Sequence, residues 1–472
     1  MFGLKKLFDV AADRHYWRGF AAYKRGEFER AIARYTWAIA WNPQHAWALD
    51  GGGNARGAQG DYSGALADYI SATDLLPDHA GMLGNLGRCH KNLGDLDKAI
   101  TVLDKAVALD PVHANNHYFR AETLGLMGRL DEAESAVSRV LELEPQDPAA
   151  RYDRGHVRAR RGKHAEAIAD FEAMLSLSPR YPAAYYGRGC SHAALANFDA
   201  AIADFSAYLA ERGDDGDALY RRGYCHLQTG AHEKAIADFD RVVALSHGGT
   251  DTLIARAAAL EGLGRLRAAF DDCSRAIAID PGLVNAYLRR ASLAVRLRDY
   301  ATLLEDGNRL VALPDGKSGG HFARGVAYFV TGKLDAAIAE YDAIAALTPD
   351  EPEAYLCRAA AFLETGGSER MQADYKRYLE LMRQPSTCRQ FNGRAWAQFA
   401  LGLFEDALPD AERAIEADPA DASAYSTRAH ILEALGRPED AASDFHAALS
   451  RRPDELIERK AREGLARLST PE

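Results

Sequence analysis

Few residues in this sequence have the type and spacing that catalysis or metal binding requires. The glycines of residues 51–54, GGGN, resemble a phosphate-binding loop, and His113 and His117 could share a metal ion. The glycines lie inside a predicted helix, however, where Gly53 occupies a site for a small residue, and no further ligand accompanies the two histidines. No GxSxG, Walker, HExxH or zinc-binding spacing occurs elsewhere. We therefore predict a protein that is not an enzyme and that has no metal site and no cofactor.

Four tyrosines recur at intervals of 34 residues, at Tyr118, Tyr152, Tyr186 and Tyr220. Such rings form a ladder if each interval folds into the same structural unit. A ladder of this kind offers apolar surface and hydroxyl groups, which are the contacts that a bound peptide requires. The same rings could instead pack between neighbouring units, and both interpretations remain open at this point.

The unit that must position these tyrosines is a pair of helices, best seen in residues 148–181. Apolar and small residues follow helical spacing in two blocks, which Gly162 separates. In the second block Ala167, Phe171 and Met174 lie on one helix face. One hairpin of this size cannot bury its own apolar faces, so it requires neighbours of the same kind.

The same pattern returns every 34 residues from residue 12 to residue 455, with two extra residues before the twelfth unit. Every unit has Gly or Ala at its eighth position, and most have Gly near the fifteenth, Ala at the twentieth and an aromatic residue at the twenty-fourth. This pattern resembles the tetratricopeptide repeat family. The resemblance implies an all-α fold, an α-α superhelix (solenoid) of thirteen helix–turn–helix hairpins. The hairpins begin at Ala12, Ala46, Ala80, Ala114, Pro148, Pro182, Gly216, Thr250, Val284, Ser318, Pro352, Cys388 and Ala422.

The resemblance also indicates where a partner would bind. In this family, the second, fifth, ninth, twelfth and thirteenth positions of the first helices line a concave groove. The four tyrosines occupy the fifth position, and the predicted groove residues are Tyr118, Glu122, Tyr152, His156, Tyr186, Tyr220 and Tyr224. The implied function is a non-catalytic scaffold or adaptor that holds a protein or peptide segment in this groove. The alternative is a structural protein that assembles with itself through its ends or its tryptophan-rich first hairpin.

Charged residues recur with the same period. Arginine occupies the seventh position of hairpins four to thirteen, and an acidic residue occupies the twenty-third from hairpin five onward. Both positions lie beside the seam between the two helices, so we predict guanidinium–carboxylate contacts within a hairpin or with its neighbour. The predicted pairs are Arg154–Asp170, Arg188–Asp204, Arg222–Asp238, Arg256–Asp272, Arg290–Asp306, Arg324–Glu340, Arg358–Asp374, Arg394–Asp410 and Arg428–Asp444.

The ends and one internal stretch depart from the repeat. Residues 1–11 are expected to pack on the first hairpin, and a weak membrane-surface anchor is the alternative. Residues 456–468 are predicted to form a capping helix, followed by a loose tail, residues 469–472. The repeats are irregular around 298–387, where small residues and turn glycines are replaced and the links are glycine-rich. We expect weaker stacking in that stretch.

Composition limits the partners and the location. The net charge is −11, from 57 Lys and Arg against 68 Asp and Glu, and no basic block persists across adjacent hairpins, which disfavours nucleic acid. No apolar run approaches the ~18 residues of a membrane span, so we expect no stable membrane insertion. The six cysteines lack disulfide spacing and the N-terminus lacks a secretion signal, which predicts a cytoplasmic protein. The oligomeric state stays open.

Overall fold

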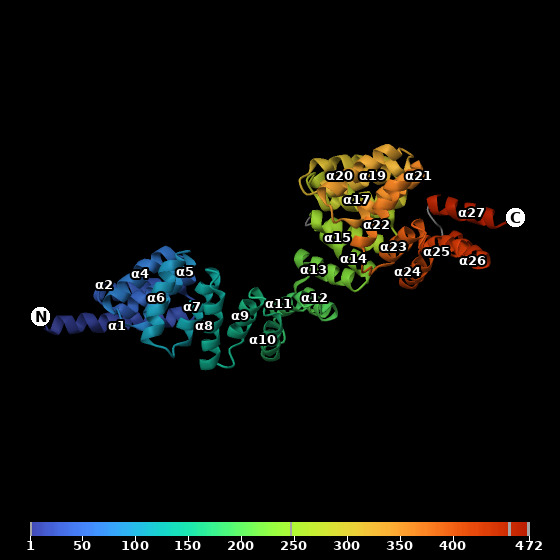
Figure 1. Ribbon diagram of the computed structural model, residues 1–472. Helices are drawn as coiled ribbons and strands as arrows, with labels where there is room; N and C mark the ends of the chain where they lie inside the picture. Colours follow the sequence, from blue (N-terminus) through green and yellow to red (C-terminus); the bar gives the residue numbers. More distant parts are fainter. Residues whose placement is uncertain (1, 246–247, 452–454, 470–472) are drawn as a thin grey trace. The chain divides into compact units, whose positions relative to one another are not determined.

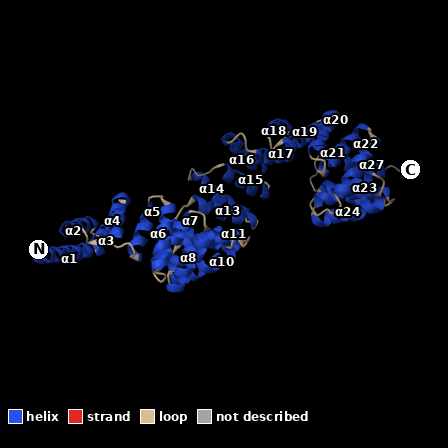
Figure 2. Ribbon diagram, turned by 60° about the vertical axis from the view of Figure 1, so that its left-hand side comes forward, coloured by secondary structure: helices blue, strands red, loops and turns tan. Residues whose placement is uncertain are grey.

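The computed structural model describes residues 2–245, 248–451 and 455–469. These residues are helical and include no strand, as the ribbon views make plain (Figure 1; Figure 2). The chain divides into an N-terminal unit, residues 1–247, and a C-terminal unit, residues 248–472. The predicted all-α fold of stacked hairpins is confirmed within each unit.

The N-terminal unit consists of consecutive helix pairs, in which each odd-numbered helix packs on the even-numbered helix that follows it and each pair packs on the next. Its helices are α1 (Phe2–Lys24), α2 (Phe28–Trp41), α3 (Ala46–Ala58), α4 (Tyr62–Leu75), α5 (Ala80–Asn92), α6 (Leu96–Leu109), α7 (Ala114–Leu126), α8 (Leu130–Leu143), α9 (Pro148–Arg160), α10 (His164–Leu177), α11 (Pro182–Ala194), α12 (Phe198–Arg212), α13 (Gly216–Gln228) and α14 (His232–Ala244).

The C-terminal unit repeats this arrangement and ends in a helix, α27, that packs against α25 and α26. Its helices are α15 (Thr250–Gly262), α16 (Leu266–Ile279), α17 (Val284–Leu297), α18 (Tyr300–Ala312), α19 (Lys317–Val330), α20 (Leu334–Leu347), α21 (Pro352–Thr365), α22 (Ser368–Leu381), α23 (Cys388–Ala400), α24 (Phe404–Ala417), α25 (Ala422–Ala434), α26 (Pro438–Ser450) and α27 (Glu455–Ser469).

Glycine at the turn explains where most hairpins reverse. A left-handed backbone is accessible to glycine without the steric cost that a Cβ atom brings. Two turns adopt the same conformation without glycine, at Ala196 and Arg298, each with φ of 58°. The glycines near the fifteenth position of the hairpins, which the repeat pattern predicts at the turns, have positive φ at Gly26, Gly60, Gly94, Gly128, Gly162, Gly230, Gly264, Gly332, Gly402 and Gly436.

The small residue at the eighth position makes room for the aromatic residue at the twenty-fourth. The ring of Phe171 is fully buried. A Cβ atom added to Gly155 of the same hairpin would lie 2.9 Å from Phe171 Cε1, and one added to Gly187 of the next hairpin would lie 2.7 Å from Phe171 Cζ. One ring therefore joins the two helices of its own hairpin to the first helix of the next hairpin.

The predicted ladder of ion pairs is confirmed, and every pair lies within one hairpin. Seven pairs have N–O distances of 2.6–2.7 Å, Arg290–Asp306 has 2.5 Å, and Arg324–Glu340 is also in contact. The carboxylates are buried, with Asp306 at 0% exposure. Arg120 of hairpin four has no acidic residue at the matching position and pairs instead with Asp104 of the preceding hairpin, at 2.6 Å. The carboxylates belong to the interior of each hairpin rather than to a solvated face.

The two ends of the chain lie close to their nearest hairpins. Residues 2–11 are the beginning of α1 and not a separate element. The ring of Phe8 lies 5.5 Å from that of Trp41, and Asn42 Nδ2 donates to Asp9 Oδ1 at 3.0 Å. At the other end Ala461 of α27 is fully buried. Met1 and most of the expected tail, residues 470–472, lie outside the described residues.

Helices α18 and α19 approach each other closely inside the irregular stretch. A Cβ atom at Gly307 would lie 3.0 Å from the carbonyl oxygen of Gly320, and one at Gly320 would lie 2.6 Å from the backbone nitrogen of Val311. Leu303, which replaces the usual alanine, is 1% exposed. This part of the stretch is well packed.

Candidate functional site

The four predicted tyrosines line up on successive first helices, α7, α9, α11 and α13, and each is half-buried. Three of the rings contact the buried phenylalanine of their own hairpin. The ring centroids are 6.0 Å apart for Tyr152–Phe171, 5.9 Å for Tyr186–Phe205 and 5.8 Å for Tyr220–Phe239. Burial raises the pKa of Tyr152 to about 12. The tyrosines thus extend the core outward to the surface of the first helices.

Two of the tyrosine hydroxyl groups bond to the next hairpin. Tyr186 donates to Asp217 Oδ2 of α13. Burial, followed by a hydrogen bond to Asp153 of α9, raises the pKa of Tyr118 far above its ordinary value. These hydroxyl groups tie neighbouring first helices together, so they contribute to stacking as well as to the surface.

The three residues predicted at the ninth position differ in accessibility. Glu122 forms an ion pair with Lys91 at 2.8 Å, and the ring of His156 meets that of Tyr152 edge-on at 4.4 Å. Burial lowers the pKa of His156, so the ring is neutral at neutral pH. Tyr224 is the most open of the three, at 45% exposure.

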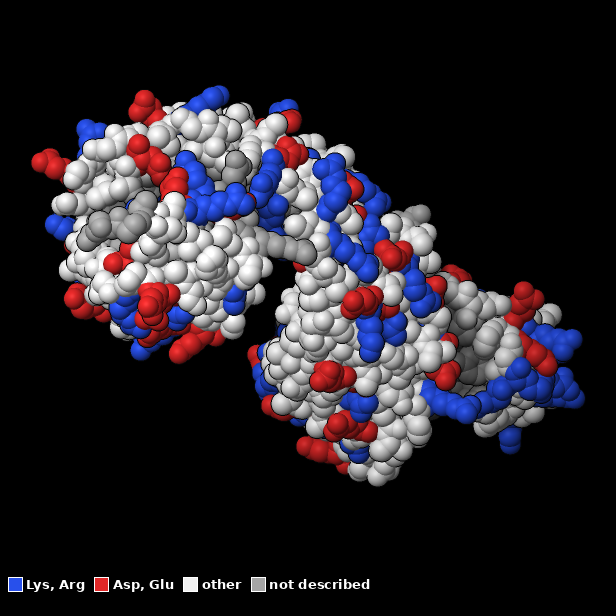
Figure 3. All heavy atoms as spheres, turned by 90° about the vertical axis from the view of Figure 1, so that its right-hand side faces the viewer, with Lys and Arg blue, Asp and Glu red and all other residues white. Residues whose placement is uncertain are grey.

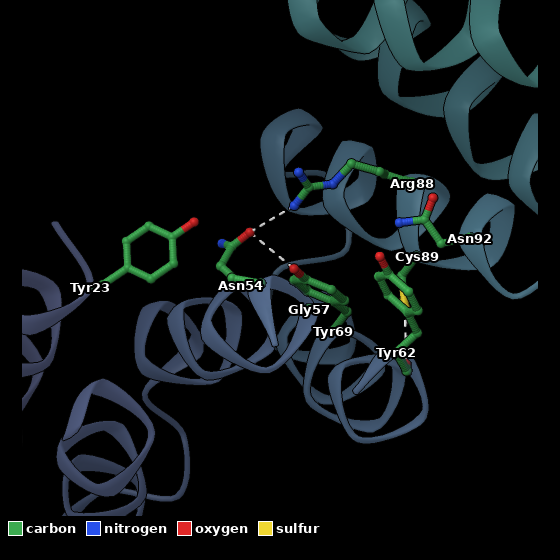
Figure 4. A pocket seen from close by; sticks show the side chains of 9 residues that line it. Tyr23, Asn54, Gly57, Tyr62, Tyr69, Arg88, Cys89 and Asn92 are labelled. Atoms are coloured by element: carbon green, nitrogen blue, oxygen red, sulfur yellow. Dashed lines mark hydrogen bonds between the residues drawn. The ribbon is translucent and has the colours of Figure 1, made fainter. Parts of the chain in front are cut away.

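A small polar pocket of 140 Å³ lies between α1, α3, α4 and α5 (Figure 4). Figure 4 shows Arg88 and Tyr69 directed at Asn54, and both donate to Asn54 Oδ1, at 3.1 and 3.0 Å. Asn54 Nδ2 donates in turn to Asp50, whose pKa burial raises. Among the described residues Arg88 forms no ion pair, but its guanidinium lies 5.2 Å from the ring centroid of Phe119. The polar groups of the pocket are mostly satisfied by one another.

A larger and more apolar hollow lies in the C-terminal unit, between α17, α19, α21 and α23. Its volume is 840 Å³, and its apolar lining includes Leu288, Val295, Phe322 and Val326. Leu288 and Val295 are 39% and 38% exposed. Cys357 also lines an adjoining hollow of 230 Å³, which reaches α25 and α27. We call these two hollows together the C-terminal groove.

The C-terminal groove was not among the predicted sites, although the positional rule applied to the tyrosines identifies it. Leu288, Phe322 and Leu356 occupy the fifth position of hairpins nine to eleven, and Val326 and Trp396 occupy the ninth position of hairpins ten and twelve. Aliphatic side chains in a helix are usually buried, so their types did not distinguish a surface from a core. The periodic position was the available signal.

Charged groups stand at one side of the C-terminal groove. Glu351 and Glu353 both line it, as do Arg296 and Arg389, and interaction with Glu353, followed by burial, raises the pKa of Glu351. The groove therefore carries charged groups of both signs beside its apolar lining. Over the face in Figure 3, acidic and basic side chains are interspersed and most of the surface is neutral.

The part of the chain that the structure describes holds no cluster of possible metal ligands. No three His, Cys, Asp or Glu side chains there converge on a possible metal site. His117 Nε2 lies 3.0 Å from the carbonyl oxygen of Pro111, in the link that precedes its own helix. All six cysteines are free thiols. A search of the described helices for a stretch that could cross a membrane finds none.

Stacked helix hairpins with surface grooves define the class of helical-repeat proteins. Sequence profiles for the tetratricopeptide repeat match residues 58–123, 93–155, 128–185, 186–249 and 392–467, and a further profile for the TPR repeat matches residues 322–366. The chain belongs to the tetratricopeptide repeat family, a fold that generally serves as a scaffold for protein interactions.

Solved structures with a similar fold are also known. The APC/C hetero-tetramer Cut9–Hcn1 gives 13% identity and a TM-score of 0.44 over 100% of this chain and 99% of that chain. Yeast Tom70 has 16% sequence identity and a TM-score of 0.42, over 90% of this chain and 95% of that chain. A tetratricopeptide repeat protein from Parabacteroides merdae has 20% identity and a TM-score of 0.40, over 53% of this chain and 99% of that chain. Comparison with curated protein sequences gives no significant match.

Proposed function

We propose that this protein is a non-catalytic scaffold or adaptor whose C-terminal groove holds a segment of a protein partner. The observation that supports this most directly is the 840 Å³ hollow with partly exposed Leu288, Val295 and Phe322. Apolar side chains one helical turn or one hairpin apart can receive the anchoring side chains of an extended or helical segment.

The charges beside the groove indicate the chemistry of that segment. A basic group of the partner would pair with Glu351 or Glu353, and an acidic group with Arg389. We therefore propose a mainly apolar segment with flanking charged residues. Free thiols throughout the chain support a cytoplasmic location.

The surface formed by Tyr118, Tyr152, Tyr186, Tyr220 and Tyr224 is a second candidate for partner contact. Tyr224 is its most accessible ring, whereas Tyr118 and Tyr186 already bond to the protein. Changing Tyr152 and Tyr186 together to alanine should weaken binding by a few kcal/mol if these rings are anchors. Lowered thermal stability with unchanged affinity would assign them to packing.

Selection of a random peptide library on the full-length protein tests the groove. Selected peptides should share apolar anchors, and Leu288→Asp or Val295→Asp should weaken their binding at least ~10-fold. Leu347→Asp is the matched control, because Leu347 is 49% exposed on α20 and does not line the groove. Equal binding by all variants would place the site elsewhere.

Measurement of molecular mass in solution separates this function from self-assembly. A scaffold of this kind should keep a constant mass as its concentration rises. Mass that grows with concentration, and that falls when Trp37 is replaced, would instead favour the structural alternative.

A further inference from the structure

Large apolar side chains are exposed on both helices of the first hairpin, α1 and α2. Leu7, Val10 and Trp17 of α1 are 66%, 63% and 62% exposed, and Trp37 of α2 is 57% exposed. The spacing of the first three places them on one face of α1. Tyr16, on another face of the same helix, contacts His45 with ring centroids 5.2 Å apart. Trp17 borders this contact, since its ring lies 5.1 Å from that of Tyr16.

Three arginines stand among these apolar groups. Arg14, Arg18 and Arg34 are exposed, and within the described part of the chain none of them forms an ion pair. Their position is fixed by His15, whose ring stacks on that of Trp37 at 6.2 Å. Burial, followed by the positive charges of Arg34, Arg18 and Arg14, lowers the pKa of His15. Arg18 and Arg34 line one hollow together with Trp37.

Between α1 and α2 the surface is hollowed over 650 Å³. Small side chains, Ala21, Ala22 and Ala33, line the hollow together with Arg18 and Arg34. Glu27 also lines it, but this carboxylate is already paired with Arg25 at 2.9 Å and with Arg30 at 3.2 Å. The hollow therefore presents unpaired positive charge. We call it, with Leu7, Val10, Arg14, Trp17 and Trp37, the N-terminal outer face.

Exposed tryptophan with arginine is the combination that proteins place at the membrane–water interface, where indole rings enter the headgroup layer and guanidinium groups meet phosphates. The chain as a whole carries a charge of −11, so general attraction to anions is not expected. An anionic surface would therefore be attracted by the local positive charge of the N-terminal outer face and not by the net charge of the chain.

We propose that the N-terminal outer face docks on the surface of an anionic lipid membrane. Trp17, Trp37, Leu7 and Val10 enter the headgroup region, and Arg14, Arg18 and Arg34 contact lipid phosphates. Docking of this kind is peripheral and needs no spanning helix, and none was found among the described residues. A second copy is a poorer occupant, because at the opposite end α27 carries cations such as Arg462 among its acidic residues.

Sedimentation of the full-length protein with lipid vesicles tests the proposal. The protein should bind vesicles of phosphatidylserine and phosphatidylcholine at low salt, and should bind pure phosphatidylcholine at least ~10-fold more weakly. Tryptophan emission should shift to the blue as the rings leave water. Because each cation near an anionic membrane contributes about fivefold, the triple change Arg14→Gln, Arg18→Gln and Arg34→Gln should reduce binding by about 100-fold.

Two matched variants act as controls. Trp47 is 47% exposed on α3, outside the N-terminal outer face, so Trp47→Ala should bind normally whereas Trp17→Ala with Trp37→Ala should not. Lys98 is 68% exposed on α6, and Lys98→Gln should also bind normally. All these side chains are exposed, so unchanged circular dichroism should accompany each change.

Three results would overturn the proposal. The first is the absence of binding to phosphatidylserine vesicles at low salt. The second is equal binding by the wild type, the arginine variant and the tryptophan variant. The third is a protein that does not bind vesicles and that forms a dimer through Trp17 and Trp37, which would assign this face to a second copy of the chain.

Discussion

Replacing Asp306 with alanine should open the ninth hairpin while leaving distant hairpins closed. Asp306 is 0% exposed and accepts hydrogen bonds from Arg290 Nε at 3.0 Å and Nη2 at 2.5 Å. Removal of one partner leaves an uncompensated charge, which in buried pairs costs about 3–5 kcal/mol. Arg290 is 15% exposed and still donates to Ser274 Oγ at 3.1 Å, so we expect the lower end, about 3 kcal/mol.

Two further variants separate the ion pair from its surroundings. Arg290→Met combined with Asp306→Leu removes both charges and should cost less than ~1 kcal/mol, or stabilise the hairpin. Asp440→Ala breaks the pair with Arg437, whose side chains are 52% and 55% exposed, and should cost at most ~1 kcal/mol. The difference between the variants therefore reports burial and not charge alone.

The assay must resolve single hairpins, because a solenoid opens locally and a single midpoint does not describe it. Native-state hydrogen exchange of α17 and α18 should be about 150-fold less protected in the Asp306→Ala variant. Protection within fivefold of the wild type would refute the reasoning. So would a double variant that loses as much protection as the single variant.

Three other outcomes are expected. Gly155→Ala should lower the free energy of unfolding by about 1–3 kcal/mol, because the added Cβ atom would lie 2.9 Å from the ring of Phe171. Gly125→Ala meets no atom within 4 Å and should stabilise α7 by up to ~1 kcal/mol, and thermal denaturation compares the two variants. Burial lowers the pKa of His430 below 6.5, so below pH 6.5 the unfolded chain binds a proton that the folded chain does not. The last hairpins should therefore lose stability as the pH falls, and circular dichroism should show less of this loss in His430→Leu than in the wild type. Hydrogen exchange should find opening concentrated in residues 298–387, except where α18 meets α19, and uniform protection would contradict this prediction.

Much of the fold was predictable because each hairpin repeats one rule. A period of 34 residues determines which side chains meet, so the contact between Arg154 and Asp170 follows from their spacing of 16 once the hairpin is recognised. The exceptions to this rule could be identified only in the three-dimensional structure. Nothing in the type of Arg298 indicates a left-handed backbone, and Gly307 gives no sign in the sequence that it faces Gly320.

The candidate site was less accessible to sequence reasoning. Tyr152 and its counterparts were predicted to bind a partner because tyrosine combines a ring with a hydroxyl group. The hydroxyl group of Tyr186, however, bonds to Asp217 of the next hairpin. Leu288 and Phe322 occupy the equivalent position in later hairpins, where they line a hollow between neighbouring helices. Exposure depends on those neighbours, and a single sequence does not contain that information.

The nine ion pairs that close within their own hairpins have a consequence for how such a chain can change in length. Loss or duplication of a whole 34-residue unit between hairpins six and thirteen would leave each carboxylate of these nine pairs with its own guanidinium. The junction would still have to match aromatic and small residues, but none of these nine pairs would lose a partner. The boundary between hairpins four and five differs, because the buried Glu134 of hairpin four takes Arg158 and Arg161 of hairpin five as its partners. Exchange of whole hairpins after the fifth therefore preserves the buried ion pairs, whereas loss of the fifth hairpin would leave Glu134 without these partners.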